Sequence, residues 1–308
     1  MRALVTGCAG FIGSHLTERL LKDGFEVVGI DRFSAYYPRE IKERNLAPAL
    51  KHERFQLVEQ DILETPELPP VDYIFHQSAQ AGVRASWGKD FEIYVRDNVL
   101  VTQKLLEFYK DQKVARFVYA SSSSIYGNAE LPLKEDKVPT PISPYGVTKL
   151  AGENLCHLYR VNYGLPVISL RYFTVYGPRQ RPDMAINKMV LNISNGKEIL
   201  IFGDGTQTRD FTYVADIVEA NVLAARSDIE GKIFNIGGGN RISVNDLVKL
   251  IGEILGKEPR VRYIEEQKGD VRHTWAHIDR ARAELGWQPQ VNINEGLRKY
   301  IDSVIPNR

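Results

Sequence analysis

Short apolar runs alternate with amphipathic segments through the first half of the chain. The amphipathic segments carry apolar residues at helical spacing, as in residues 13–24 and 98–111. The apolar runs are rich in valine, isoleucine or aromatic residues and predict six β-strands, at residues 2–7, 26–31, 55–61, 71–79, 115–122 and 166–173. Strands that alternate with helices are typical of a parallel sheet with helices on both faces. We therefore expect an α/β fold with a doubly wound parallel sheet, whose ligands bind at the carboxyl ends of the strands.

The pattern changes after residue 171, where loops rich in glycine, proline and arginine appear. We divide the chain into a first domain, residues 1–171, and a smaller C-terminal lobe, residues 172–308, which is expected to hold the substrate. The sequence KIFNIGGG, residues 232–239, has the composition of one more buried strand. The segment 209–239 is therefore expected to return to the first domain, so that the lobe is interleaved with it.

The composition excludes several classes of function. The 308 residues include 40 lysines and arginines against 39 acidic residues, so the net charge of +1 gives no overall attraction to nucleic acid or to a membrane. No apolar run reaches the length of a membrane span, and the opening MRALVTG does not resemble a signal peptide, which predicts a cytoplasmic protein. Cys8 and Cys156 are far apart and in no metal-ligand spacing, so we expect inert buried thiols and no metal site.

A glycine-rich turn follows the first strand and opens the first helix. In VTGCAGFIGSHL, Gly7, Gly10 and Gly13 let the backbone approach a pyrophosphate, which would sit on the free N–H groups and positive end of the helix, beside Phe11 and Ile12. This context predicts a Rossmann-type dinucleotide site.

Two charged residues at the end of the second strand bear on the choice of dinucleotide. Asp31 stands 18 residues after Gly13, close to the spacing of an acid that holds a ribose 2′-hydroxyl. A carboxylate there repels a 2′-phosphate, which favours NAD over NADP. Arg32 leaves the question open, because an adjacent guanidinium could accept a phosphate.

Polar and small residues close the next two strands. Asp61, with Ile62, ends the third strand, where a carboxylate can meet the adenine amino group. The fourth strand ends in Gln77, Ser78, Ala79 and Gln80, whose small side chains would let a cofactor lie against the backbone. Each of these residues could also be ordinary polarity at a strand end.

The sequence SPYGVTKLAGE places Tyr145 and Lys149 four residues apart, on one face of a predicted helix. A free tyrosine has a pKa of about 10, and a nearby ammonium together with a positive nicotinamide ring would lower it toward that of a usable base. Upstream, YASSSSIYG sets hydroxyl groups at the end of the fifth strand, where one of them could bridge a substrate oxygen and the phenolate.

At this point the sequence resembles the extended short-chain dehydrogenase/reductase family, and within it the nucleotide-sugar epimerases and dehydratases. The motifs that carry the resemblance span nearly the whole chain, in the order TGCAGFIGSHL, SSSSIYG, PYGVTK, RYFTVYGP, FGDGTQTRDFTYVADI and GDVRHTWA. The resemblance implies that Tyr145 is the catalytic base, that Lys149 lowers its pKa and binds the ribose, and that Ser122 is the catalytic hydroxyl.

The same resemblance implies the remaining contacts. Asn98 and Tyr172 are expected at the cofactor. Arg209 is expected to grip the nucleotide diphosphate, with Asp270 and Arg272 at the nucleotide, although each of the three could instead form a surface ion pair. The full set of expected substrate contacts is Val83, Arg84, Ser122, Ser123, Ser124, Thr174, Arg181, Arg209, Asp270 and Arg272.

The residues after the catalytic hydroxyl bear on the type of reaction. Decarboxylases and 4,6-dehydratases of the family carry acidic residues where this chain has Ser123 and Ser124. Their absence favours plain 4-epimerisation. In the implied cycle Tyr145 takes the 4-hydroxyl proton as the C4 hydride passes to NAD⁺, the 4-keto sugar turns over, and the hydride returns to its opposite face.

The loop RYFTVYGPRQRPDM suggests the sugar. It resembles the loop of UDP-glucuronate 4-epimerases, in which Thr174 and Arg181 would embrace a C6 carboxylate, and AQAGVR with Arg84 resembles the same branch. Ser122 stands where uronate epimerases often have threonine, so a UDP-glucose or UDP-N-acetylhexosamine 4-epimerase is the alternative, with Arg181 as a surface charge.

Two further hypotheses concern the class of protein and its partners. A catalytically silent NAD-binding sensor could use the same fold, but it would not need Tyr145, Lys149 and a strand-end hydroxyl together. The family similarity also implies a homodimer that packs through the helices near residues 90–110 and 145–162. The apolar faces of those helices are equally consistent with packing within one chain.

Overall fold

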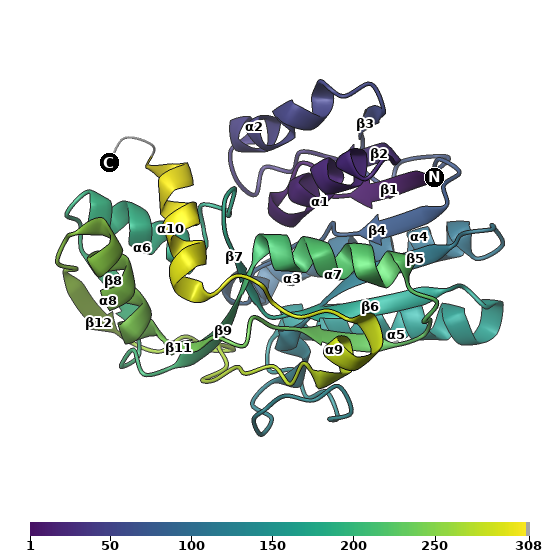
Figure 1. The fold of residues 1–308 in the computed structure, drawn as a ribbon. Coiled ribbons are helices and arrows are strands. Elements are labelled where there is room, and N and C mark those ends of the chain that lie inside the picture. The colour runs from purple at the N-terminus through teal and green to yellow at the C-terminus, as the bar shows by residue number, and fades with distance from the viewer. Residues whose placement is uncertain (306–308) are drawn as a thin grey trace.

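A seven-stranded parallel sheet forms the centre of the molecule, which the computed structural model describes over residues 1–305. Its strand order is β10-β6-β5-β4-β1-β2-β3 (Figure 1). The strands are β1 (Arg2–Thr6), β2 (Glu26–Asp31), β3 (Phe55–Glu59), β4 (Tyr73–His76), β5 (Arg116–Ser122), β6 (Val167–Tyr172) and β10 (Ile233–Ile236). The six predicted strands and the doubly wound α/β fold are confirmed.

Helices cover both faces of this sheet and bury its alternating side chains. On β1, Ala3 and Val5 belong to one core cluster, with α1 (Phe11–Lys22) and α7 (Val214–Arg226), while Leu4 belongs to a second cluster, with α4 (Val101–Tyr109) and α5 (Pro144–Tyr163). This alternation follows from the two-residue period of a strand. Helix α2 (Arg39–Leu50) packs beside α1 and β3.

The helix predicted for residues 98–111 has a more complex form. A short helix α3 (Phe91–Tyr94) leads into a π-helical turn, η3 (Val95–Leu100), and then into α4. Two 3₁₀ turns precede it, η1 (Arg84–Ser86) and η2 (Gly88–Asp90). Single π turns inside helices occur often at functional sites, and Asp97 of η3 lines a cavity of this structure.

The C-terminal lobe has two small sheets. One has the order β11-β9-β7 and the other pairs β12 with β8. Its strands are β7 (Thr174–Tyr176), β8 (Ile199–Phe202), β9 (Thr208–Tyr213), β11 (Arg241–Ser243) and β12 (Val261–Ile264). Its helices are α6 (Ala185–Ser194), α8 (Val244–Leu255), α9 (Asp279–Leu285) and α10 (Ile293–Val304). Figure 1 shows α6, α8 and α10 together, to the left of the large sheet.

The segment 209–239 is divided between the two parts. Strand β10 pairs with β6 in the large sheet, so the strand predicted at residues 232–239 is confirmed. Helix α7 packs on β5 and β6, whereas β9 pairs with β7 and β11 in the lobe. Only α7 and β10 of this segment therefore join the first domain. Within residues 1–305, no helix combines the length and apolar character that crossing a membrane requires.

Candidate functional site

A cavity of about 430 Å³ lies between the carboxyl ends of the central strands and the loop after β7. Of the residues predicted to contact the cofactor, those that line it are Gly7, Gly10, Phe11, Ile12, Gly13, Asp31, Arg32, Asp61, Ile62, Gln77, Ser78, Ala79, Gln80, Tyr145, Lys149 and Tyr172. Of the predicted substrate contacts, those that line it are Val83, Ser122, Ser123, Ser124, Thr174 and Arg181. Residues more than 170 positions apart in the sequence therefore line the same cavity.

The glycine turn is shaped for a close approach of backbone to ligand. A Cβ on Gly13 would lie 2.1 Å from the carbonyl oxygen of Gly7, so only glycine fits there. Gly7 has a φ of +68°, and a Cβ on it would lie 2.9 Å from the Cα of Ser78. Gly10 precedes α1 without any side-chain cap. The first N–H groups of α1 therefore have no side-chain acceptor, and this turn can receive a pyrophosphate.

Asp31 lies at the end of β2 with both carboxylate oxygens bonded to the backbone. The amides of Ala9 and Phe33 donate to it at 3.2 and 2.8 Å. A carboxylate can accept about four hydrogen bonds, so acceptor capacity remains for a ribose hydroxyl. The ammonium of Lys42 lies 3.8 Å from Asp31 and donates to Ser34. Lys42 also lines the cavity, and no sequence signal marked it, because it lies in the middle of a polar helix.

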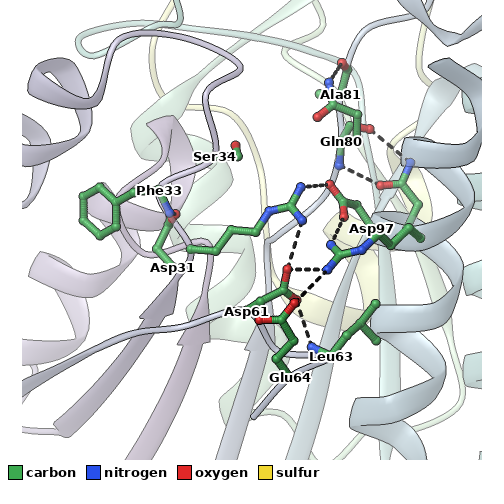
Figure 2. Close-up of polar contacts among 12 residues, drawn as sticks. Asp31, Phe33, Ser34, Asp61, Leu63, Glu64, Gln80, Ala81 and Asp97 are labelled. Carbon is green, nitrogen blue, oxygen red and sulfur yellow. Dashed lines mark hydrogen bonds and ion pairs between the residues drawn. The ribbon is translucent and has the colours of Figure 1, made fainter.

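Arg32 and Asp61 belong to a closed ring of charges at the end of the cavity near β2 and β3. Arg32 donates to Asp61 at 3.0 Å and to Asp97 at 2.6 Å, and Arg96 donates to the same two carboxylates at 2.6 and 3.1 Å. Figure 2 shows Asp61 and Asp97 linked through these guanidinium groups, with Asp31 apart from both. Asp97 lines the cavity too, and the sequence analysis missed it.

The surroundings of the ring shift the pKa values of Asp61 and Asp97 in opposite directions. Burial raises the pKa of Asp61, but hydrogen bonds from Arg96, the amide of Leu63 and Arg32 outweigh burial and leave that pKa low. Burial dominates at Asp97 and raises its pKa, although the two guanidinium groups oppose it.

Asn98 lies behind the cavity wall and does not line it, unlike the direct cofactor contact that we expected. Its side-chain amide accepts from the backbone N–H of Gln80 at 2.8 Å and donates to the carbonyl of Gln80 at 3.0 Å. It also donates to the hydroxyl of Thr148 on α5. Asn98 therefore fixes Gln80, which does line the cavity, against the helix that carries Tyr145.

Ser122, Tyr145 and Lys149 meet where β5 ends and α5 begins. Ser143 caps α5 by accepting from the amide of Gly146 at 3.1 Å, so Tyr145 and Lys149 occupy the first turns. Burial raises the pKa of Tyr145, against a hydrogen bond with Ser122 and the positive charge of Arg181. Arg181 is therefore one cation that acts on Tyr145, and the expected effect of Lys149 on this pKa stays a prediction.

Lys149 is itself buried, with its ammonium 4.5 Å from the centre of the Tyr119 ring. Burial lowers the pKa of Lys149 to about 8, and the negative charge of Glu153 acts in the opposite direction. The ammonium is therefore protonated at neutral pH but close to its titration range.

Arg181 reaches the cavity from the loop that follows β7. Its guanidinium donates to Asp183 at 2.9 and 3.0 Å, and Tyr36 donates to the same carboxylate at 3.2 Å. The alternative of a surface charge is wrong, because the Arg181 side chain is only 20% exposed and lines the cavity. Tyr36 also lines the cavity and was not among the predicted site residues, although aromatic residues in a polar loop after a strand offered a signal.

The other two arginines of this loop region have partners away from the cavity. Arg171 pairs with Glu153 inside the protein. Arg179, at a φ of +64°, pairs with Glu18 on α1 at 2.7 Å. Neither is a candidate for binding a substrate anion.

Four predicted substrate contacts do not line the cavity and gather at the edge of the lobe instead. Arg84 donates to Asp270 at 2.6 Å and lies 3.9 Å from the centre of the Phe202 ring. Arg209 donates to the carbonyl of Arg272, and the charges of Asp270 and Arg84 both act on Arg209. Arg84 from η1 thus meets Arg209, Asp270 and Arg272 of the lobe, and none of the four lines the cavity that holds Tyr145.

Known proteins resemble the chain over its full length. A model of the NAD dependent epimerase/dehydratase family matches residues 3–237. The UDP-glucuronate 4-epimerase of Thermodesulfobacterium geofontis is 41% identical, over 97% of this chain and 94% of its own. A Bacillus subtilis protein named as an uncharacterized UDP-glucose epimerase is 42% identical, over 98% of this chain and 97% of its own.

Solved structures agree with this assignment. The UDP-glucuronic acid 4-epimerase of Bacillus cereus, in complex with UDP-glucuronic acid and NAD, has a TM-score of 0.96 against this chain at 44% identity, and 99% of each chain is covered. Because the family model and full-length relatives coincide with a Rossmann-type fold, the chain belongs to the NAD dependent epimerase/dehydratase family.

Proposed function

We propose that this protein is a UDP-glucuronate 4-epimerase, which uses tightly bound NAD to interconvert UDP-glucuronate and UDP-galacturonate. One observation carries the proposal: Thr174 and Arg181 line the same cavity as Tyr145 and Lys149. The charge of Arg181 acts on the Tyr145 phenol. A sugar whose 4-hydroxyl meets that phenol would therefore place its C6 substituent near a guanidinium.

The cavity offers what a dinucleotide needs. The glycine turn leaves the N-terminus of α1 open to a pyrophosphate, and Asp31 retains acceptor capacity for a ribose hydroxyl. When NAD is bound, it supplies a hydride acceptor that oxidises C4 and returns the hydride to the opposite face of the sugar.

The chain's own residues handle the proton of the 4-hydroxyl. Tyr145 accepts it as general base, and the hydrogen bond from Ser122 together with the charge of Arg181 stabilises the phenolate that the reaction needs. Lys149 brings a second positive charge to the site, which favours anionic oxygen at C4. The return of the proton from Tyr145 completes the epimerisation.

The carboxylate of a uronate needs control once C4 is a ketone. The 4-keto uronate is a β-keto acid, and CO₂ leaves when the C5–C6 bond aligns with the carbonyl π system. Arg181 can hold the carboxylate by two parallel hydrogen bonds, with Thr174 as a further donor, and so keep that bond out of alignment.

A neutral-sugar 4-epimerase is the alternative, in line with the name of the Bacillus subtilis relative. Such an enzyme would bind a C6 alcohol and gain little from a guanidinium in its cavity. The position of Arg181 therefore favours the uronate.

A panel of UDP-sugars tests the assignment. The purified protein, without added NAD, is incubated with UDP-glucuronate, UDP-glucose and UDP-N-acetylglucosamine, and the C4 configuration is followed by proton NMR. We expect turnover of UDP-glucuronate alone, with no release of CO₂. Turnover of UDP-glucose with UDP-glucuronate untouched would refute the proposal.

We also propose that two copies of the chain form the active protein. Apolar side chains remain exposed on α3, η3 and α5, at Ile93, Leu100, Val147, Leu158 and Val161. Helix α3 and η3 both pack against α5, so a second copy that docks there could cover these side chains. Light scattering after size exclusion should give twice the chain mass, and the Val147→Asp/Val161→Asp variant should give the mass of one chain; a wild-type monomer would contradict the idea.

A further inference from the structure

We propose that Asp97 is a residue that determines cofactor specificity. Together with Asp61 it holds the Arg32 guanidinium in a ring of ion pairs, so that the pocket accepts a ribose with a free 2′-hydroxyl and rejects a 2′-phosphate. The inference rests on the proposed use of a nicotinamide dinucleotide, but it concerns binding and not the epimerisation.

Arg32 stands where a phosphate-binding arginine could stand, directly after Asp31 and in the cavity wall. Its positive charge is already compensated through both terminal nitrogens. One donates to Asp61 at 3.0 Å and the other to Asp97 at 2.6 Å. Other N–H groups of the guanidinium remain, but a phosphate would have to compete with two carboxylates for its charge.

Breaking an ion pair would be costly because of the way the ring closes. Each carboxylate also accepts from Arg96, so Asp61 and Asp97 each bridge two guanidinium groups. The side chains of Asp61 and Asp97 are only 12% exposed, against 32% for Arg32. Turning Arg32 toward a phosphate would leave a mostly buried carboxylate with only one of its two counter-ions. A buried charge that is incompletely paired is strongly destabilising.

The charges around the expected ribose site also disfavour a further anion. Asp31, Asp61, Asp97 and Glu64 carry four negative charges, and Arg32, Arg96 and Lys42 carry three positive charges. Lys42 is buried and directed to Asp31 and Ser34. A 2′-phosphate would add about two negative charges to a cluster that is already net negative, beside the carboxylate of Asp31.

Asp97 can perform this task without disturbing its neighbour. It lies in the π turn η3 next to Asn98, and the two side chains face different partners. Asp97 faces Arg32 and Arg96, while Asn98 holds Gln80 and Thr148. A substitution of Asp97 therefore removes the ion pairs and leaves the contacts of Asn98 in place.

Calorimetric titration with NAD and NADP, on protein from which bound nucleotide has been stripped, tests the inference. In the wild type we expect NAD to bind at least 100-fold more tightly, because the 2′-phosphate of NADP would lie beside Asp31 and meet an arginine whose charge is already compensated. In Asp97→Ala, which frees one nitrogen of Arg32, the ratio of the two dissociation constants should shift toward NADP by about tenfold.

Two further variants separate the mechanism from other effects. Glu64→Gln is the matched control, because Glu64 lies 4.0 Å from Arg96 in the same cluster and is not among the partners of Arg32. Its ratio of dissociation constants for NAD and NADP should equal that of the wild type. In Asp97→Ala/Arg32→Leu the gain for NADP should disappear.

If Asp97→Ala does not fold, Asp97→Asn replaces it. The inference is overturned if the ratio of the dissociation constants for NAD and NADP is unchanged in the folded Asp97 variant. It is also overturned if the gain in NADP binding persists when Arg32 is replaced. Neither result depends on which sugar the protein epimerises.

Discussion

The carboxylate of Glu153 accepts two hydrogen bonds from the guanidinium of Arg171, at 2.6 and 3.0 Å, directly behind the cavity wall. Both side chains are at most 4% exposed. Glu153 lies two helical turns after Tyr145 and also accepts from Ser121, the neighbour of Ser122, at 2.7 Å. The pair therefore joins the helix that carries Tyr145 to the strand that carries Ser122.

This geometry predicts a large loss of stability in Glu153→Gln. The variant leaves the buried charge of Arg171 without its counter-ion, and the free energy of unfolding should fall by about 3–5 kcal/mol in urea titrations. In the double variant Glu153→Gln/Arg171→Met neither charge of the pair remains, so its loss should be smaller than the sum of the losses in Glu153→Gln and Arg171→Met. Additive losses would contradict a coupled pair.

Tyr145→Phe removes the phenolic hydroxyl and keeps the aromatic ring of the side chain. If Tyr145 is the base, the turnover of UDP-glucuronate should fall by at least about 10³-fold, because proton transfer loses its acceptor. NAD should still bind, since the glycine turn and Asp31 are unaffected. Turnover is followed by NMR and binding by calorimetry. Turnover within a few fold of the wild type would remove Tyr145 from the mechanism.

Arg181→Ala tests the carboxylate site. We expect kcat/KM for UDP-glucuronate to fall by about 10²-fold or more, or CO₂ to be released, because a charge-assisted bidentate contact is lost. Arg179→Ala is the matched control from the same loop, since Arg179 pairs with Glu18 and does not line the cavity. Equal effects of the two variants would indicate that the loop needs positive charge in general and that Arg181 has no specific role.

His76 predicts how stability depends on pH. It is buried between Thr6 and Thr102, at 2.8 and 2.9 Å, and burial, followed by the charge of Lys149, lowers its pKa to about 3. Its unfolded value is about 6.5, so the unfolded chain takes up the proton first as the pH falls. The folded state is therefore favoured above pH 6.5 and loses this advantage progressively as the pH falls toward 3.

The pH dependence of stability that arises from His76 is large enough to measure. Between pH 6.5 and 5 the wild type should lose about 2 kcal/mol of unfolding free energy through this group. His76→Gln should abolish that part of the pH dependence, whereas His157→Gln, on the exposed face of α5, should leave it unchanged. Identical pH profiles of the wild type and His76→Gln would show that another group carries the effect.

Much of the fold and part of the site could be predicted because their signals are local. The alternation of strands and helices follows from periods of two and 3.6 residues. The glycine turn, the strand-end hydroxyls and the Tyr145–Lys149 spacing each lie within a dozen residues. Their places in one cavity follow from the order of parallel strands, while their chemical roles stay predictions for the experiments above.

Departures from the sequence expectations arose where a contact joins distant segments. Asn98 binds Gln80 and so lies behind the wall, and the π turn around it interrupts the expected regular helix. Arg209 lies in the lobe and outside the cavity lining, because its strand β9 pairs with β7 and β11 and not with the large sheet. Arg84, from η1, reaches Asp270 of the lobe.

The sequence by itself determined the class of fold, the dinucleotide turn and the identity of the chemistry-bearing side chains, because these depend on local spacing. Only the tertiary structure decided which charges neutralise one another. Arg171 meets Glu153, Arg32 meets Asp97 across 65 positions, and Arg181, although paired locally with Asp183, acts on Tyr145. Such pairings depend on which strand ends and loops lie side by side, and an arginine's own surroundings in sequence carry no record of that.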